Sequence, residues 1–137
     1  MQEHVSYWMD LAAYDLSAAK GLLRTKHYLY VGFMCHQVIE KALKAVISRD
    51  GNLPPKIHQL MRLADQCELL EKMTEEQKDT IRKLSPLNIE ARYPEQKEQI
   101  ASVLSAKFCR EIIQETEELL FWIKEQLWPQ SNDTPNG

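Results

Sequence analysis

The stretch 28–47 places the strongest constraint on the fold. Its apolar residues recur every three or four positions, at Val31, Met34, Cys35, Val38, Ile39, Ala42, Leu43 and Val46. This spacing places them on one side of an α-helix, and that side must be buried. The opposite side carries His36, Gln37, Glu40, Lys41 and Lys44. We expect a solvated face there, because such a run of charges usually faces water and its helical pairs contribute only about 0.2–0.5 kcal/mol each.

The same apolar period predicts helices before and after this stretch. One covers residues 2–24, and the link of Thr25, Lys26 and His27 is so short that the second helix, ending near Arg49, should return antiparallel to the first. A shorter amphipathic helix is expected over 58–70.

Local signals place the remaining helices. Thr74 and Gln77 form a capping-box pattern, so a helix should begin there and continue to about Arg92, with a kink or break at Ser85-Pro86. A polar loop over 95–99 then leads to the last helix, 102–127. The prediction is an all-α protein.

Composition adds limits on organisation and partners. With 137 residues and only 4 glycines, the chain fits one helical domain, 1–128, followed by a polar tail, 129–137, that we expect to be disordered. The net charge of -3 argues against a protein that coats nucleic acid through a general positive field. The first ten residues resemble no signal peptide, and no apolar run approaches the ~20 residues of a membrane span, so we expect a cytoplasmic protein.

The cysteines and the N-terminal aromatic residues are interpreted as structural. Each of Cys35, Cys67 and Cys109 lies in an apolar helical stripe without a CxxC pair, which is typical of reduced thiols in a core. The aromatic residues around the first hairpin are expected in the core and at a dimer surface: Tyr7, Trp8, Tyr14, Tyr28 and Tyr30.

With the helices placed, one combination of motifs stands out. Ala-Tyr-Asp-Leu in the first helix precedes the segment from His36 to Ala45, which reads HQVIEKALKA. His58-Gln-Leu follows the Pro-Pro loop, and Ala-Arg92-Tyr93-Pro94 comes later. In this order the motifs resemble the HEPN domain family of bacteria and archaea, over nearly all of residues 3–127.

The resemblance implies an up-and-down, antiparallel bundle of four long helices with a shorter one, usually a homodimer. It also implies a partner, because HEPN proteins are often encoded beside a small nucleotidyltransferase in a two-gene module similar to toxin-antitoxin systems. Some members are metal-independent ribonucleases, and others are described as nucleotide-binding partners. No cofactor is implied.

The sequence departs from the ribonuclease branch at its signature. That branch carries an arginine followed four to six residues later by a histidine, whereas here Arg24 is three residues before His27 and Arg49 is nine before His58. Near the end of the fourth predicted helix, Arg92 has no histidine after it. A composite site that uses His58 from elsewhere in the fold remains open.

Four further interpretations concern single groups. Arg92 can clamp a phosphate and Tyr93 can stack on a base, or Arg92 pairs with an acid such as Glu40 while Tyr93 only closes the helix. His58 can act as a general acid or base, although a histidine after a Pro-Pro loop more often caps or packs. Lys41 and Lys44 can contact phosphate. His36 and Glu40 have metal-ligand spacing but no third ligand, so no metal site is predicted.

Three functions follow from these interpretations. The first is a HEPN component of a nucleotidyltransferase-linked module that binds a nucleotide or a nucleotide-bearing partner. The second is a ribonuclease toxin in which Arg92 binds the scissile phosphate and His58 moves the proton. The third is a non-catalytic interaction module that uses surface aromatic and apolar patches.

Overall fold

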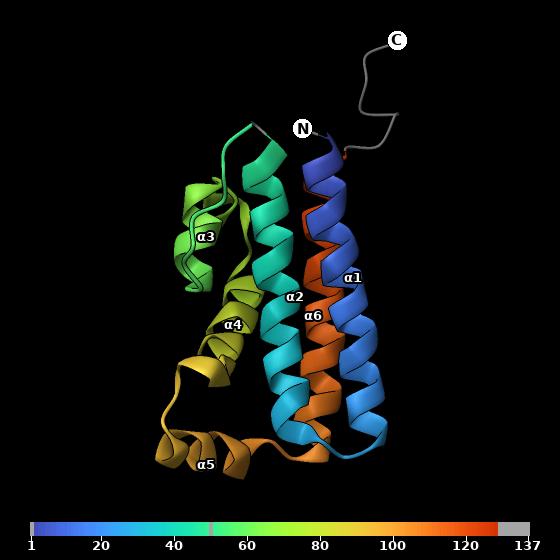
Figure 1. The fold of residues 1–137 in the computed structure, drawn as a ribbon, viewed down its shortest axis with the longest axis vertical. Coiled ribbons are helices and arrows are strands. Elements are labelled where there is room, and N and C mark those ends of the chain that lie inside the picture. Colours follow the sequence, from blue (N-terminus) through green and yellow to red (C-terminus); the bar gives the residue numbers. More distant parts are fainter. Residues whose placement is uncertain (1, 50, 129–137) are drawn as a thin grey trace.

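The computed structural model describes residues 2–49 and 51–128, and within this part of the chain all regular structure is helical (Figure 1). The α-helices are α1 (Gln2–Arg24), α2 (Tyr28–Arg49), α3 (Leu60–Gln66), α4 (Glu75–Leu84), α5 (Pro94–Val103) and α6 (Ala106–Leu127). Short 3-10 turns lie at Leu70–Lys72, Ser85–Leu87 and Ile89–Ala91. The prediction of an all-α protein is confirmed. The tail predicted at 129–137 lies outside the described residues.

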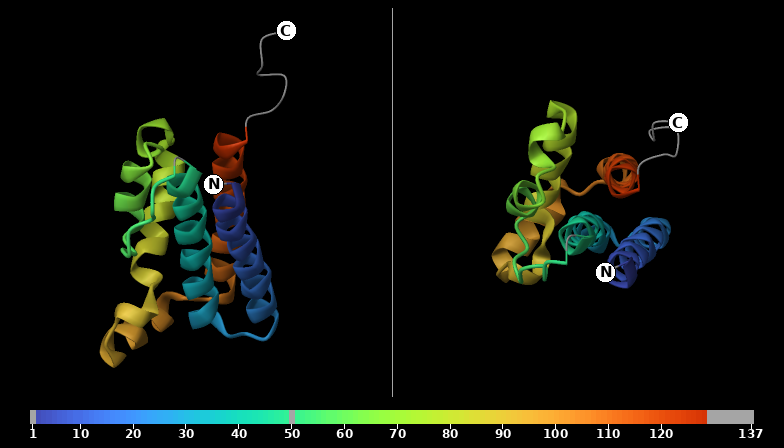
Figure 2. Two further views of the ribbon diagram at one scale, coloured as in Figure 1. Left: turned by 45° about the horizontal axis from the view of Figure 1, so that its top comes forward. Right: turned by 90° about the horizontal axis from the view of Figure 1, so that it is seen from above.

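Successive bundle helices alternate in direction. In Figure 1, α1 descends, α2 ascends, α4 descends and α6 ascends, while α5 lies across the lower end. The view from above in Figure 2 places α2 between α1 on one side and the α3 and α4 region on the other. The antiparallel up-and-down arrangement is therefore confirmed. Three helices are long, α1, α2 and α6, whereas α4 has only 10 residues.

The local signals at α4 act as predicted. The backbone N–H of Gln77 donates to Thr74 Oγ1 at 3.1 Å, and the N–H of Thr74 donates to Gln77 Oε1 at 2.9 Å, which completes the capping box. The α-helix ends at Leu84, and Pro86 lies in the 3-10 turn that follows. The break expected at Ser85-Pro86 is confirmed, but regular α-helix does not resume before Arg92.

Predicted boundaries are wrong at three places. The polar loop expected over 95–99 is part of α5, which begins at Pro94. At the N-terminus of α5, Tyr93 N–H donates to Gln96 Oε1 at 2.9 Å. The last helix begins at Ala106 rather than at residue 102, because Ser105 caps it by accepting from the N–H of Phe108. The third helix is also shorter than predicted and covers only Leu60–Gln66.

The largest correction concerns α2. His36, Glu40 and Lys44, expected on a solvated face, are buried. The reason is that α2 packs on α1 and α6 with one side and on α3 and the 85–87 turn with the other, so little of its surface meets water. The polar stripe of α2 is therefore an interior feature.

The other structural predictions have mixed outcomes. Cys35 and Cys109 are buried free thiols and Cys67 is half-buried, and burial raises the pKa of Cys35 to about 12. Tyr7, Tyr14 and Tyr30 are exposed and so do not belong to the core, while their place at a dimer surface stays a prediction. None of the described helices combines the length and the apolar character that crossing a membrane requires.

Candidate functional site

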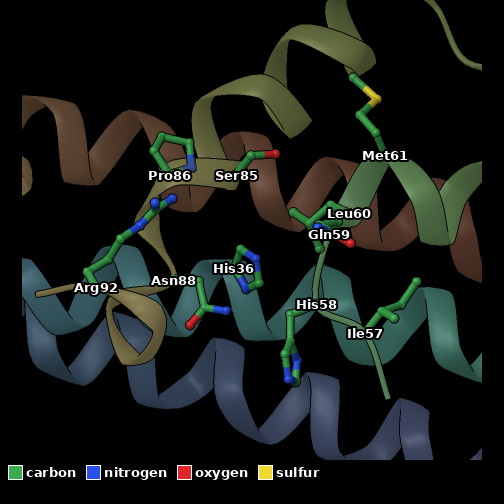
Figure 3. Close-up of a pocket in the computed structure, with 10 residues that line it drawn as sticks. All are labelled: His36, Ile57, His58, Gln59, Leu60, Met61, Ser85, Pro86, Asn88 and Arg92. Atoms are coloured by element: carbon green, nitrogen blue, oxygen red, sulfur yellow. The ribbon is translucent and has the colours of Figure 1, made fainter. Parts of the chain in front are cut away.

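A cavity of about 690 Å³ opens on the side of α2 that faces α3 (Figure 3). One wall comes from the loop between α2 and α3 and from the start of α3, and another comes from the irregular segment after α4. The described residues that line it are His36, Ile57, His58, Gln59, Leu60, Met61, Ser85, Pro86, Asn88 and Arg92. Its volume is in the range of small-molecule sites.

Glu40 is the centre of a buried polar network behind this cavity. Its Oε2 accepts from Nζ of Lys44 at 2.9 Å and from Nδ1 of His58 at 2.8 Å. The Glu40 side chain is only 6% exposed, so both contacts are charge-assisted hydrogen bonds in a poorly solvated place. The ammonium of Lys44 also lies over the ring of Trp8, 5.7 Å from its centroid. The carboxylate therefore ties the loop that carries His58 to the middle of α2.

His36 is a buried imidazole beside the same carboxylate. Its Nδ1 lies 3.6 Å from Glu40 Oε1, which is too long for a hydrogen bond, and neither atom has another partner. Burial lowers the pKa of His36, and the nearby Glu40 carboxylate opposes that shift to a smaller extent. The imidazole is therefore neutral at neutral pH, with an unsatisfied nitrogen next to the cavity.

Asn88 and Arg92 are held in the cavity wall by the irregular backbone after Pro86. Asn88 stands between the two 3-10 turns and is 9% exposed, and its Oδ1 is buried without a partner. Nε of Arg92 is likewise buried without a partner. Each unmet group costs roughly 1–3 kcal/mol in the free protein, so a ligand that satisfies them would gain that stabilisation. In Figure 3, Asn88 lies between Arg92 and His36.

The structure brings His58 and Arg92 to one cavity without turning them toward each other. In Figure 3 the guanidinium of Arg92 extends toward Pro86, whereas the imidazole of His58 extends away from both toward α1. His58 does not cap α3, because the N-cap residue is Gln59 and no side chain bonds there. The alternative of an Arg92–Glu40 ion pair is wrong: the partners of Glu40 are His58, Lys44 and His36.

The remaining predicted site residues lie elsewhere. Lys41 forms an ion pair with Asp15 of α1, and both side chains are largely buried between the helices. Lys44 contacts Glu40 rather than the cavity. Tyr93 is 75% exposed and does not line the cavity. In the part of the chain that the structure describes, no group of three or more His, Cys, Asp or Glu residues is arranged to hold a metal ion.

The sequence interpretation gives Asn88 no role and does not identify the partners that Glu40 has from outside its own helix. Asn88 carries no spacing signal, since its burial depends on the turn after Pro86. The sequence pairs Glu40 with His36 and Lys44 on its own helix, or with Arg92. What makes it central is His58, which the fold brings from the following loop.

A second hollow of about 590 Å³ lies between α4 and α6. Its main polar groups already satisfy one another, because Glu115 Oε1 accepts from Thr80 at 3.1 Å and from Lys83 at 3.2 Å. The cavity with unsatisfied groups is therefore the stronger candidate for a binding site.

The fold and this cavity define a helical bundle that carries a partly polar pocket on one side of its central helix. The sequence matches the model of the HEPN domain over residues 5–126, and the chain belongs to that family. The crystal structure of an archaeal HEPN homologue superimposes with a TM-score of 0.69 at 20% sequence identity, covering 90% of this chain and 97% of the other. At this identity the likeness supports the fold alone. No curated protein matches the sequence.

Proposed function

We propose that this protein is the ligand-binding HEPN component of a two-gene module with a minimal nucleotidyltransferase. In this proposal the cavity beside α2 holds a nucleotide, either free or carried by the partner, and the protein works as a cytoplasmic homodimer. Family membership supports the general assignment. The cavity supports the ligand class.

The observation that carries the proposal lies in the guanidinium of Arg92. Its Nε is buried without a partner, and none of the described residues that line the cavity is acidic. An arginine fork in such a place complements a phosphate, which it can bind through two parallel hydrogen bonds. The neighbouring apolar wall suits the uncharged part of a nucleotide.

Calorimetric titration with nucleoside monophosphates and triphosphates tests this proposal. We expect saturable binding that Arg92→Ala weakens at least about tenfold, because a charge-assisted pair is lost. Arg110→Ala is the matched control, since it also removes one positive charge but lies on the exposed surface of α6. Equal weakening by both substitutions would show that general charge, and not the cavity, attracts the nucleotide.

A metal-independent ribonuclease is the second candidate, because His58 and Arg92 line the same cavity. Arg92 would bind the scissile phosphate and His58 would take the proton of the attacking 2′-hydroxyl. The missing arginine-to-histidine signature and the outward direction of the His58 ring count against it.

Incubation with tRNA and single-stranded RNA in excess chelator separates the two candidates. Cleavage that both His58→Ala and Arg92→Ala abolish, in variants that keep their melting temperature, would favour the ribonuclease. Intact RNA would favour the binding component. Light scattering after size-exclusion chromatography tests the dimer, and a monomer at micromolar concentration would contradict it.

A further inference from the structure

We propose that Asn88 selects the base of a nucleoside monophosphate whose phosphate is bound by Arg92. The inference rests on the proposed nucleotide binding and adds the residue that distinguishes a nucleotide from a simple sugar phosphate. It starts from Asn88, whose buried Oδ1 has no hydrogen-bond partner within the fold.

Asn88 has none of the usual structural reasons for an asparagine at a turn. It occupies the N-cap position of the 3-10 turn Ile89–Ala91, yet its side chain makes no capping hydrogen bond. Its Oδ1 is buried without a partner, and the residue as a whole is 9% exposed. A buried amide oxygen without a partner is rare in folded proteins, and it points to a ligand donor that the free chain lacks.

The chemistry of the Asn88 amide defines which hydrogen-bonding groups a ligand must present to it. A phosphate only accepts hydrogen bonds from these side chains, so it satisfies Nε of Arg92 but leaves Oδ1 of Asn88 unpaired. The amide presents an acceptor beside a donor, and its complement is an edge with a donor beside an acceptor. Nucleobase edges have this pattern, and asparagine pairs with adenine in this way in the DNA major groove.

The cavity wall favours a base over the ribose hydroxyls, which also combine donor and acceptor. The apolar part of the cavity lining is supplied by Ile57, Leu60, Met61 and Pro86. A planar ring can bury its face on such a surface, whereas a sugar exposes hydroxyls around its whole edge. Figure 3 shows Pro86 close to the Arg92 guanidinium, whereas the Asn88 amide extends from the neighbouring backbone in the opposite direction, toward α2.

The test compares ligands that contain one or both parts. AMP, CMP, GMP and UMP are titrated into the full-length protein by calorimetry, beside ribose 5-phosphate and the four nucleosides. We expect at least one nucleotide to bind at least about tenfold more tightly than ribose 5-phosphate, because only the base can both pair with Asn88 and bury a ring face on the apolar wall. If ribose 5-phosphate binds as tightly as every nucleotide, the phosphate site stands and base selection by Asn88 is wrong. If none of the nucleotides binds, the proposed function fails as well.

Two substitutions assign the effect to Asn88. Asn88→Leu keeps the branched shape and the number of side-chain heavy atoms and removes a buried unpaired oxygen, so the melting temperature of the free protein should be equal or higher. The preference for nucleotide over ribose 5-phosphate should disappear, while ribose 5-phosphate binds as before. Asn88→Ala gives the same comparison without branched bulk. Gln99→Ala, which removes an exposed amide of α5, should change neither the melting temperature nor the preference for nucleotide over ribose 5-phosphate. An unchanged preference in both Asn88 variants would overturn the inference.

Discussion

His58, in the loop before α3, donates from Nδ1 to Oε2 of Glu40 in the middle of α2, at 2.8 Å. The carboxylate is buried, whereas the histidine side chain is 61% exposed. This hydrogen bond fixes the loop that supplies Ile57 and Gln59 to the cavity. The buried polar network of α2 therefore holds one wall of the cavity in place.

Removing Glu40 should destabilise the fold strongly. Glu40→Ala leaves the ammonium of Lys44 buried without its carboxylate, and we expect the free energy of unfolding to fall by about 3 kcal/mol. Urea denaturation measures this. Glu117→Ala is the matched control, because it breaks the exposed pair with Lys20 and should cost less than about 1 kcal/mol. Equal losses would contradict a special role for the buried network.

His58→Ala should loosen the cavity wall more than the protein as a whole. The lost hydrogen bond to Glu40 is worth about 1 kcal/mol of global stability, because one partner is largely exposed. Amide hydrogen exchange at residues 56–60 should accelerate, while exchange in α6 remains slow. His27→Ala, which removes an exposed imidazole hydrogen-bonded to nearby Thr25, should leave hydrogen exchange at residues 56–60 unchanged. Unchanged exchange in His58→Ala would mean that the loop is held by other contacts.

His36 should make the protein less stable in mild acid. Its pKa is lowered in the folded state from the ordinary 6.5, so below that pH the unfolded chain binds a proton that the folded chain resists. The free energy of unfolding should therefore fall as the pH drops from about 7 to about 5, by at most about 1.4 kcal/mol per pH unit from this group. Urea denaturation across this range should show a shallower slope for His36→Gln. The same slope in both proteins would exclude His36 as the source.

Gly32 should tolerate alanine but not leucine. A Cβ at this position would lie 3.2 Å from Cδ1 of Leu87 and 3.4 Å from Cδ1 of Leu104. In Gly32→Ala the helix gains up to about 1 kcal/mol in propensity and loses a similar amount to this crowding. Gly32→Leu should destabilise by about 2 kcal/mol and weaken ligand binding, because Leu87 directly precedes Asn88.

Gly21 of α1 provides the control. A Cβ there meets only the end of the Arg24 side chain at 3.7 Å, so Gly21→Ala should stabilise the protein by about 0.5–1 kcal/mol. Thermal unfolding and calorimetric titration of the three variants check both predictions. Full binding by Gly32→Leu would show that the 85–91 segment does not need this close approach to α2.

Much of the helical framework was predictable because its signals are local. Thr74 and Gln77 interact within one turn, and Pro86 interrupts the helix that contains it, so both effects are visible in a short window of sequence. The failure to predict α5 also comes from a local signal, the proline at its start. The sequence analysis predicts that a helix ends before Pro94, but proline is equally suited to begin a helix, and here it begins α5.

The candidate site was predictable only in part. His58 and Arg92 were selected for their side-chain chemistry, and both line the cavity. Asn88 was missed and the stripe with Glu40 was assigned to water, because an amphipathic pattern does not reveal whether a second layer of structure covers the polar side.

The sequence by itself determined that the chain is helical, where most helices begin or end, and to which family it belongs. These properties depend on apolar period, caps and ordered motifs that lie close together along the chain. Only the tertiary structure decided that α2 is covered on both sides and that His58, Asn88 and Arg92 meet at its surface. The reason is that these contacts join segments whose distance in space is set by packing of the whole bundle, and no local pattern encodes it.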